Sequence, residues 1–171
     1  RGRAERISAV VWFSDLVGFT RISDKIGADD VLAMLNDYAQ AQIETIDAHS
    51  GHVLKFIGDG LLAIFPDDDT TKACARALDA ATKMRKRIAA MNVKRAAAGL
   101  QVTDTHLALH VGELLYGNLG APRRLDFTVL GSAVNEAARI EALCASLDQK
   151  VIVSSAFHEA AGEARNRLVS L

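Results

Sequence analysis

The sequence contains few of the residues that mark disulfide-bonded or unstructured chains. Only two of its 171 residues are cysteine and two are proline. Cys74 and Cys144 lie in alanine-rich helical patterns without metal-ligand spacing, so we expect buried, reduced thiols, as in a cytosolic protein. Pro66 and Pro122 each stand where a predicted strand ends, which is where a residue without an N–H is tolerated.

Net charge and long hydrophobic runs are also lacking. The formal net charge is -1, and 50% of residues are hydrophobic and 24% charged, which is typical of a soluble globular chain. A nearly neutral chain has no general attraction to nucleic acid or to an anionic membrane. No apolar run approaches the roughly 18 residues of a membrane-spanning helix, and no signal peptide is recognisable. We therefore expect no nucleic-acid partner, no membrane contact from this segment and a cytoplasmic location.

The length indicates one domain over residues 1–171. A chain of this length can bury a sizeable core, and no repeat, low-complexity tract or linker divides it. Because the sequence begins at Arg1 rather than Met and stops at the apolar Leu171, we expect a fragment of a longer protein. That longer protein is free to carry sensor or membrane-attached regions.

The most informative stretch is 53–65, where two apolar runs flank Gly58–Gly60. An Asp-Gly pair between two such runs predicts a β-hairpin, because both residues tolerate positive φ. The runs are almost continuously apolar, which predicts two buried central strands. Lys55 and Asp59 interrupt this pattern, and a buried charge requires a partner or a ligand. The alternative is that Asp59 only forms the turn and Lys55 only reaches the sheet edge.

The remaining periodicity predicts a mixed fold. Strand patterns occur at 7–13, in the hairpin, and at 103–111, 114–119, 125–130 and 151–153. Helical patterns occur up to about 26, from 29 to about 49, from 67–69 to the loop 94–101, at 132–147 and from about 154. Strands that come in hairpins favour a ferredoxin-like α+β fold with a largely antiparallel sheet and the helices against one face.

Two acidic residues stand at the ends of apolar strands. Asp15 follows the 7–13 strand, and Asp59 lies in the hairpin turn. If these strands are neighbours, the two carboxylates converge in a way that suits a hard divalent cation. Gly18-Phe19-Thr20 then opens a helix whose free N–H groups suit an anion. The alternative is a helix-capping Asp15 and a turn-forming Asp59.

A second set of candidates lies on the 132–147 helix. Asn135 and Arg139 are four residues apart, so they share one helix face, and arginine can stabilise charge on a phosphorus centre. The alternative is a surface arginine paired with Glu136 or Glu141. His106 and His110 lie on a strand pattern and no HExxH motif occurs, so we do not expect a zinc site there.

Three segments, Phe13–Thr20, Lys55–Gly60 and Asp126–Arg139, resemble the motifs of the class III nucleotide cyclase catalytic domain. The resemblance spans about residues 6–160 in family order. It implies two Mg²⁺ or Mn²⁺ ions at each site. It also implies the following roles: metal binding by Asp15, Asp59 and the Leu16 carbonyl; phosphate binding by the backbone of Val17, Gly18, Phe19 and Thr20; base recognition by Lys55 and Thr128; ribose orientation by Asn135; and transition-state stabilisation by Arg139.

The resemblance further implies an adenylate cyclase that converts ATP to 3′,5′-cyclic AMP and pyrophosphate. In this family one subunit supplies the metal carboxylates and the other supplies the base-reading and transition-state residues. The expected assembly is therefore a head-to-tail homodimer with two shared sites. A lysine can donate a hydrogen bond to N1 of adenine, and a threonine hydroxyl can accept one from N6. Lys55 and Thr128 therefore favour ATP over GTP.

Two departures and three alternatives qualify this expectation. Many relatives carry aspartate where this chain has Thr128, and a phosphate-binding Lys or Arg of the family falls beyond the end of this chain. A diguanylate cyclase is disfavoured because its turn reads Gly-Gly-Asp/Glu-Glu-Phe. A non-catalytic dimerisation or nucleotide-sensing domain remains an alternative, as does a cyclase that uses GTP. The sequence does not identify the regulatory input. A response to bicarbonate is associated with relatives that have threonine at the position of Thr128, and the residues of this chain carry no further sign of it.

Overall fold

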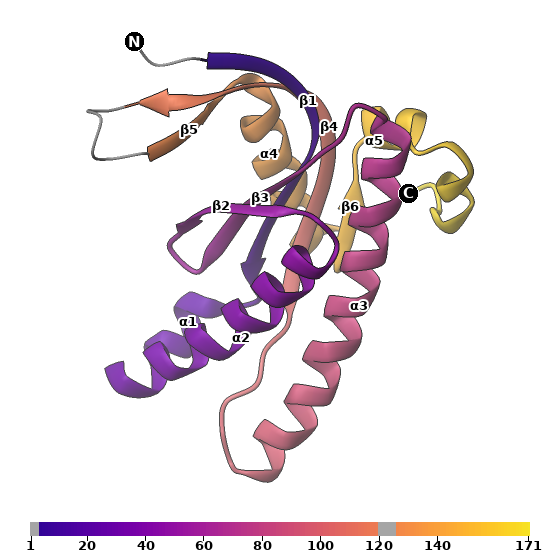
Figure 1. The fold of residues 1–171 in the computed structure, drawn as a ribbon. Coiled ribbons are helices and arrows are strands. Elements are labelled where there is room, and N and C mark those ends of the chain that lie inside the picture. The colour runs from indigo at the N-terminus through magenta and orange to yellow at the C-terminus, as the bar shows by residue number, and fades with distance from the viewer. Residues whose placement is uncertain (1–3, 120–125) are drawn as a thin grey trace.

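The computed structural model describes residues 4–119 and 126–171. The strands are β1 (Ala4–Leu16), β2 (His52–Ile57), β3 (Gly60–Pro66), β4 (Thr105–Leu119), β5 (Asp126–Leu130) and β6 (Val151–Val153). The helices are α1 (Phe19–Ser23), α2 (Ala28–Ala48), α3 (Thr70–Ala97), α4 (Ser132–Ser146), α5 (Ser155–Ala160) and the 3-10 helix η1 (Gly162–Arg167) (Figure 1). No helix in these two ranges is long and apolar enough to cross a membrane.

β1 lies at the centre of the sheet. The strand order is β2-β3-β1-β4-β5, and β6 also pairs with β4. β1 is antiparallel to both β3 and β4, and among the described strands only the β4–β6 pair is parallel. The predicted α+β fold with a largely antiparallel sheet is confirmed.

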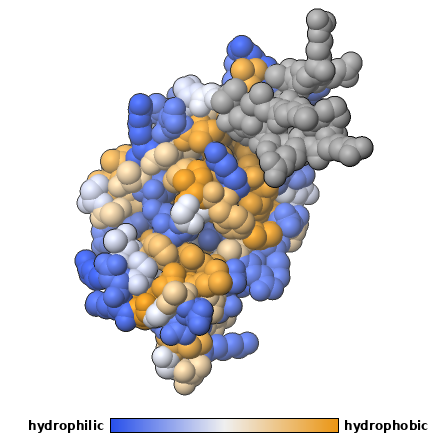
Figure 2. Space-filling model, turned by 90° about the vertical axis from the view of Figure 1, so that its left-hand side faces the viewer, coloured by the Kyte–Doolittle hydropathy of each residue, from blue (hydrophilic) through white to orange (hydrophobic). Residues whose placement is uncertain are grey.

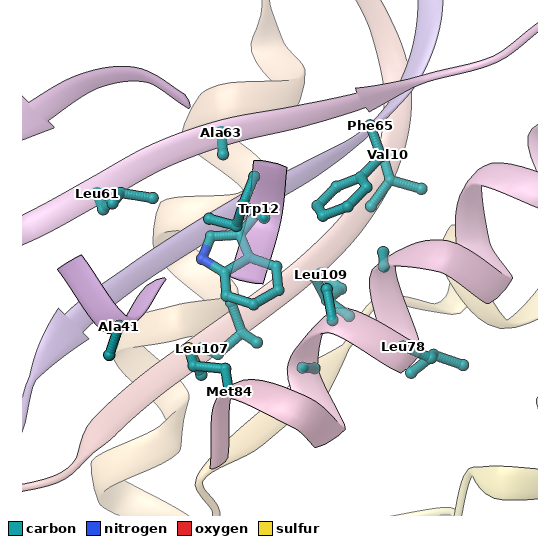
Figure 3. Close-up of a cluster of buried hydrophobic side chains, with 14 of the residues drawn as sticks. Val10, Trp12, Ala41, Leu61, Ala63, Phe65, Leu78, Met84, Leu107 and Leu109 are labelled. Atoms are coloured by element: carbon teal, nitrogen blue, oxygen red, sulfur yellow. The ribbon is translucent and has the colours of Figure 1, made fainter. Parts of the chain in front are cut away.

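The main core fills the space between one face of the sheet and the helices α2, α3 and α5. Trp12 is fully buried there, and its ring centroid lies 6.0 Å from that of Phe65. Figure 3 shows Trp12 between strand side chains such as Leu61 and helix side chains such as Met84. The long apolar faces of α2 and α3 close this core, and burying them supplies most of the helices' stability.

The opposite face of the sheet is covered by α4. Ala133 and Ala137 of α4 pack with Ala9 and Val11 of β1 and with other small apolar residues. The prediction that the helices lie against one face is therefore wrong. The reason is visible in β1, where consecutive residues from Ala9 to Trp12 are all buried, because a strand covered on both faces is apolar at every position.

Three predicted elements differ in detail. Residues 103–111 and 114–119 belong to one strand, β4, because the long β1 stays in register with it past Gly112. A Cβ at Gly112 would lie 2.6 Å from the Cβ of Ala133, so this glycine allows α4 to pack closely and does not form a turn. Helix α3 extends through residues 94–97, which are good helix formers, and ends before Gly99 (φ 70°).

The hairpin also differs from its prediction. β3 is buried along almost its whole length, but β2 is the edge strand, and Phe56 is 56% exposed. The prediction of two central strands is wrong for β2, because both runs are apolar and only the sheet order reveals which one is at the edge. Pro66 ends β3 as predicted, whereas Pro122 and Leu125 lie outside the described residues.

Candidate active site

Asp15 and Asp59 meet at one edge of the sheet. Asp15 is the penultimate residue of β1, and Asp59 lies in the turn between β2 and β3. β1 and β3 are neighbours, with Ser14 opposite Leu61, so the end of β1 reaches this turn. The backbone N–H of Leu16 donates a hydrogen bond to Oδ2 of Asp59 at 3.0 Å. The turn is thereby fixed against the end of the central strand.

A hollow of about 340 Å³ opens beside the two carboxylates. It is lined by Asp15, Leu16, Gly18, Phe19, Thr20, Arg21 and Asp59. Acidic side chains thus face the same space as the start of α1. Such a combination can hold a divalent cation together with an anionic group.

The start of α1 offers N–H groups to this hollow. Gly18 precedes the helix at φ 66° and caps it without any side chain, so nothing covers the first turn. The N–H groups of Phe19, Thr20 and Arg21 have no acceptor within the helix, because the first N–H groups of any helix lack one. No acidic side chain stands in this first turn. The segment can therefore accept an anion such as a phosphate.

Val17 is arranged differently from the residues that follow it. Its N–H donates a hydrogen bond to the carbonyl of Asp104 at 2.9 Å, and its own carbonyl accepts one from Thr103 Oγ1 at 2.5 Å. Of the backbone predicted to bind phosphate, the Val17 N–H is already used, and the groups from Gly18 onward are left for a ligand.

A hydrogen-bonded network between α2, α3 and Thr103 supports the segment that contains Val17. The N–H of Thr103 donates to the Tyr38 hydroxyl at 2.9 Å, and that hydroxyl donates to Asn92 Oδ1 at 2.5 Å. Asn92 Nδ2 in turn donates to the Thr103 carbonyl at 2.7 Å. The Arg95 guanidinium lies 5.5 Å from the centroid of the Tyr38 ring. Helices α2 and α3 therefore hold Thr103, and through it Val17, in a fixed place.

Two residues that the sequence analysis did not assign to this site, His106 and Glu141, lie beside Asp15. His106 of β4 stands opposite Asp15 in the register, and its Nδ1 lies 3.9 Å from Asp15 Oδ1. Glu141 of α4 is 8% exposed, and its carboxylate belongs to the same cluster. Asp15 Oδ1 is buried and has no hydrogen-bond donor among the described residues unless Glu141 carries a proton.

Burial, together with the neighbouring carboxylates of Asp15 and Asp59, raises the pKa of Glu141 to about 8. Burial also raises the pKa of Asp15, although the hydrogen bond with Glu141 and the charge of His106 oppose this rise. One signal could have identified Glu141 from the sequence. It falls on the stripe of α4 that includes Ala137 and Cys144, so an acid interrupts an otherwise buried apolar face.

The other predicted site residues do not line this hollow. Lys55 of β2, Asn135 and Arg139 are exposed, and Arg139 pairs with the half-exposed Glu136 at 2.9 Å. Thr128 lies in β5 opposite Gly117, and its side chain lies outside the described part of the structure. A single chain therefore brings together the predicted metal and phosphate residues but not the predicted base and transition-state residues.

Helix α4 serves both groups. Glu141 points toward Asp15, whereas Arg139, two positions earlier, is exposed on another side of the helix. Residues that are two positions apart on an α-helix are separated by about 200° of rotation, so α4 can present Arg139 and Glu141 in nearly opposite directions.

An apolar groove of about 190 Å³ runs between α2 and the hairpin, next to Asp59. Its lining includes Leu32, which is 59% exposed, and Phe56. Figure 2 views the molecule from the side where α1, the start of α2 and the hairpin turn project in Figure 1, and hydrophobic surface surrounds a hydrophilic patch there. Exposed apolar surface of this kind marks an interaction site.

Residues 3–168 match the model of the adenylate and guanylate cyclase catalytic domain. The chain belongs to this family. Adenylate cyclase 1 of Rhizobium meliloti is 34% identical over 158 residues, which are 91% of this chain and 24% of that protein.

Solved cyclase structures agree with this assignment. A bacterial light-regulated adenylyl cyclase superposes with a TM-score of 0.83 at 27% identity, covering 92% of this domain and 46% of that chain. The guanylyl cyclase Cya2 superposes with a TM-score of 0.82 at 29% identity, covering 94% of this domain and 81% of that chain. Because both kinds of cyclase resemble the domain equally well, overall similarity does not decide the base.

This cyclase-family domain spans between 8% and 30% of the length of the curated adenylate cyclases that it matches. Members of this family use divalent metal ions. The buried, unpaired Oδ1 of Asp15 and the nearby Asp59 carboxylate are oxygen ligands of the type that such ions require, so the residues present fit the metal.

Proposed function

We propose that this chain is an adenylate cyclase catalytic domain, which converts ATP to 3′,5′-cyclic AMP and pyrophosphate. The observation that carries the proposal is the hollow in which Asp15 and Asp59 face the open start of α1. Carboxylates beside free N–H groups suit a metal–triphosphate complex, which a simple dimerisation module does not need.

Two Mg²⁺ or Mn²⁺ ions would be held by Asp15, Asp59 and the carbonyl of Leu16. When bound, they would lower the pKa of the ribose 3′-hydroxyl and neutralise charge on the triphosphate. The backbone from Gly18 to Thr20 would bind the β- and γ-phosphates. Val17 would anchor this backbone and not bind phosphate, because its N–H already donates to the carbonyl of Asp104. The support given to Val17 by Thr103 keeps this backbone in place while the substrate binds and pyrophosphate leaves.

The reaction is an intramolecular displacement. The 3′-oxygen of the ribose bonds to the α-phosphorus, the bond from that phosphorus to the bridging oxygen breaks, and pyrophosphate leaves in line. The hydroxyl proton is lost to solvent or to the leaving phosphate. Asn135 would orient the ribose, and Arg139 would stabilise the charge that develops on the α-phosphate. No side-chain nucleophile is required.

The base would be read by Lys55 and Thr128. Adenine presents an acceptor at N1 and a donor at N6, which a lysine ammonium and a threonine hydroxyl can answer, whereas guanine needs an acceptor for its N1 and N2 donors. The exposed position of Lys55 leaves its ammonium free to reach a ligand. ATP is accordingly the proposed substrate, and GTP use is the alternative that the assay must test.

The active unit would be a head-to-tail homodimer. Asn135 and Arg139 are exposed and do not line the hollow of their own protomer, so a second protomer is needed to bring them to the substrate. The exposed apolar residues beside Asp59, Leu32 and Phe56 among them, offer a surface for that contact. Each dimer would contain two equivalent sites.

We also propose that residues 1–171 form one domain of a longer protein, as the much greater length of the curated relatives supports. The phosphate-binding Lys or Arg that the family places further along would then lie outside this segment. A non-catalytic sensor domain is the competing function, and it predicts dimerisation and nucleotide binding without turnover.

The test is cyclic nucleotide production by the purified chain with Mn²⁺ and either ATP or GTP. We expect cyclic AMP from ATP and much less cyclic GMP from GTP. Asp59→Ala and Arg139→Ala should each be inactive alone. Mixing equal amounts should restore about a quarter of the activity, because random exchange makes half of the dimers mixed and each mixed dimer contains one intact site of two.

Each other result has a definite meaning. Activity in a mixed sample that does not exceed that of the single variants would exclude shared sites. Preferential use of GTP would correct the base assignment. If the intact chain makes neither product, the assay is repeated with a longer C-terminus, and continued inactivity together with dimerisation would establish the sensor function.

A further inference from the structure

The cluster behind the proposed substrate site contains one imidazole and two carboxylates. One ligand atom each from Asp15, His106 and Glu141 lies within 4.8 Å of the other two. They come from three elements, β1, β4 and α4, that are fixed by sheet pairing and by packing of α4 on the sheet. Glu141 is more than nine-tenths buried, and the hydrogen bond that its carboxyl group makes is to Asp15, which requires a proton between the two carboxyl groups.

The separation of His106 and Asp15 suits a shared cation better than a direct hydrogen bond. His106 Nδ1 and Asp15 Oδ1 are 3.9 Å apart, which is too long for a hydrogen bond. Ligand atoms around a tetrahedral zinc ion at about 2.0–2.2 Å stand roughly 3.3–3.6 Å from one another. A small side-chain adjustment brings the three atoms to this spacing.

The charges of the cluster also favour a bound cation. No lysine or arginine of the described residues forms an ion pair with Asp15 or Glu141. Asp59 adds a further negative charge nearby. A buried Glu141 beside the partly buried Asp15, without a lysine or arginine partner, is costly unless one carboxylate takes a proton or a cation lies between them.

We infer that Asp15, His106 and Glu141 form a Zn²⁺ site that is distinct from the Asp15–Asp59 site proposed for the substrate metals. Three protein ligands with one imidazole leave a fourth position for water. An N/O ligand set binds Zn²⁺ more tightly than Mn²⁺, and Mg²⁺ favours oxygen ligands. This site lacks the HExxH helix motif, and His110 has no part in it, since its Nδ1 contacts Ser154 Oγ at 2.7 Å.

Zinc at this site would control the cyclase. It would engage the Asp15 carboxylate that the proposed reaction needs, so Zn²⁺ should inhibit cyclic AMP formation in competition with Mn²⁺ or Mg²⁺. This consequence rests on the proposed function, whereas zinc binding itself does not.

The first experiment is calorimetric titration of Zn²⁺ into the nucleotide-free chain in the presence of excess Mg²⁺. We expect one Zn²⁺ ion per chain. His106→Gln and Glu141→Gln should each weaken binding at least about tenfold. His110→Gln is the matched control, because it removes an imidazole from the same strand and should leave the affinity unchanged. Circular dichroism checks that each variant is folded. If Glu141→Gln does not fold, His106→Gln alone tests the inference.

Asp59→Asn separates this inference from the proposed function. It should abolish cyclic AMP formation and retain Zn²⁺ binding. Failure of the wild-type chain to bind Zn²⁺ would overturn the inference and leave a proton shared by Asp15 and Glu141 in its place. Wild-type affinity in His106→Gln would overturn it as well. Zinc binding in a chain without cyclase activity would instead reject the proposed function alone.

Discussion

The backbone N–H of Leu16 donates a hydrogen bond to Oδ2 of Asp59 at 3.0 Å, across 43 positions of sequence. This bond joins the end of the central strand to the hairpin turn and sets the distance between the two carboxylates. Gly60 makes the approach possible, since a Cβ there would lie 2.8 Å from the Ser14 carbonyl oxygen. The site therefore depends on backbone geometry as much as on its acidic side chains.

Gly60→Ala should destabilise the domain. The added methyl meets backbone rather than a flexible side chain, so the hairpin must shift away from β1. Overpacking of this kind costs about 1–3 kcal/mol in the free energy of unfolding, which urea denaturation measures. Gly27→Ala is the control, because its Cβ would meet nothing within 4 Å and the change should cost less than about 1 kcal/mol, the loss expected for alanine at the cap of α2. Equal stability of the two variants would contradict the close approach.

Asp59→Asn should separate structure from chemistry. The amide oxygen can still accept the Leu16 N–H, so the thermal unfolding temperature should change little. The loss of a negative charge that the metal requires should reduce cyclic AMP formation by about 100-fold or more. A cyclase assay and a thermal melt on the same sample check both parts. Near-normal activity would remove Asp59 from the metal site.

Thr103→Val should weaken substrate binding more than turnover. It removes the hydroxyl that donates to the Val17 carbonyl at 2.5 Å, so the backbone proposed to hold the phosphates becomes less fixed. We expect KM for ATP to rise about threefold to tenfold with a smaller change in kcat, and Thr103→Ser to restore it. Thr45→Val is the control, since its hydroxyl donates to the Ala41 carbonyl within α2. A matching change in the control would show a general structural effect.

Stability should depend on pH through Glu141. Its pKa is about 8 in the folded chain and near 4.5 when unfolded, so the folded state binds the extra proton between these values. The stabilising contribution is complete below about pH 4.5 and is lost as pH rises toward 8, with a slope of at most about 1.4 kcal/mol per pH unit.

The metal-free wild-type chain should therefore lose more free energy of unfolding between pH 5 and 9 than Glu141→Gln, whose amide does not titrate. Urea denaturation in the presence of a chelator measures this difference. Parallel pH profiles for the two proteins would show that Glu141 ionises normally, as an exposed glutamate does.

Local sequence patterns predicted most elements correctly. Helices α3 and α5 begin where predicted, and their caps are Asp69, which accepts from the N–H groups of Thr71 and Lys72, and Ser154. The prediction that Asp29 caps the second helix is wrong, because α2 begins at Ala28 after Gly27. The errors arose where a pattern is ambiguous without its neighbours. Gly112 has the signature of a turn but lies within β4 against α4, and the apolar 53–57 run lies at a sheet edge.

The sequence by itself determined the family and the kinds of side chain at the site, because Asp15, Asp59 and Arg139 each lie within a short continuous motif. Only the tertiary structure decided which of them meet. Sheet register set His106 opposite Asp15, and packing of α4 brought Glu141 beneath it. Those contacts join segments far apart in sequence, and no local propensity specifies them, since they follow from strand order and from the burial of apolar faces.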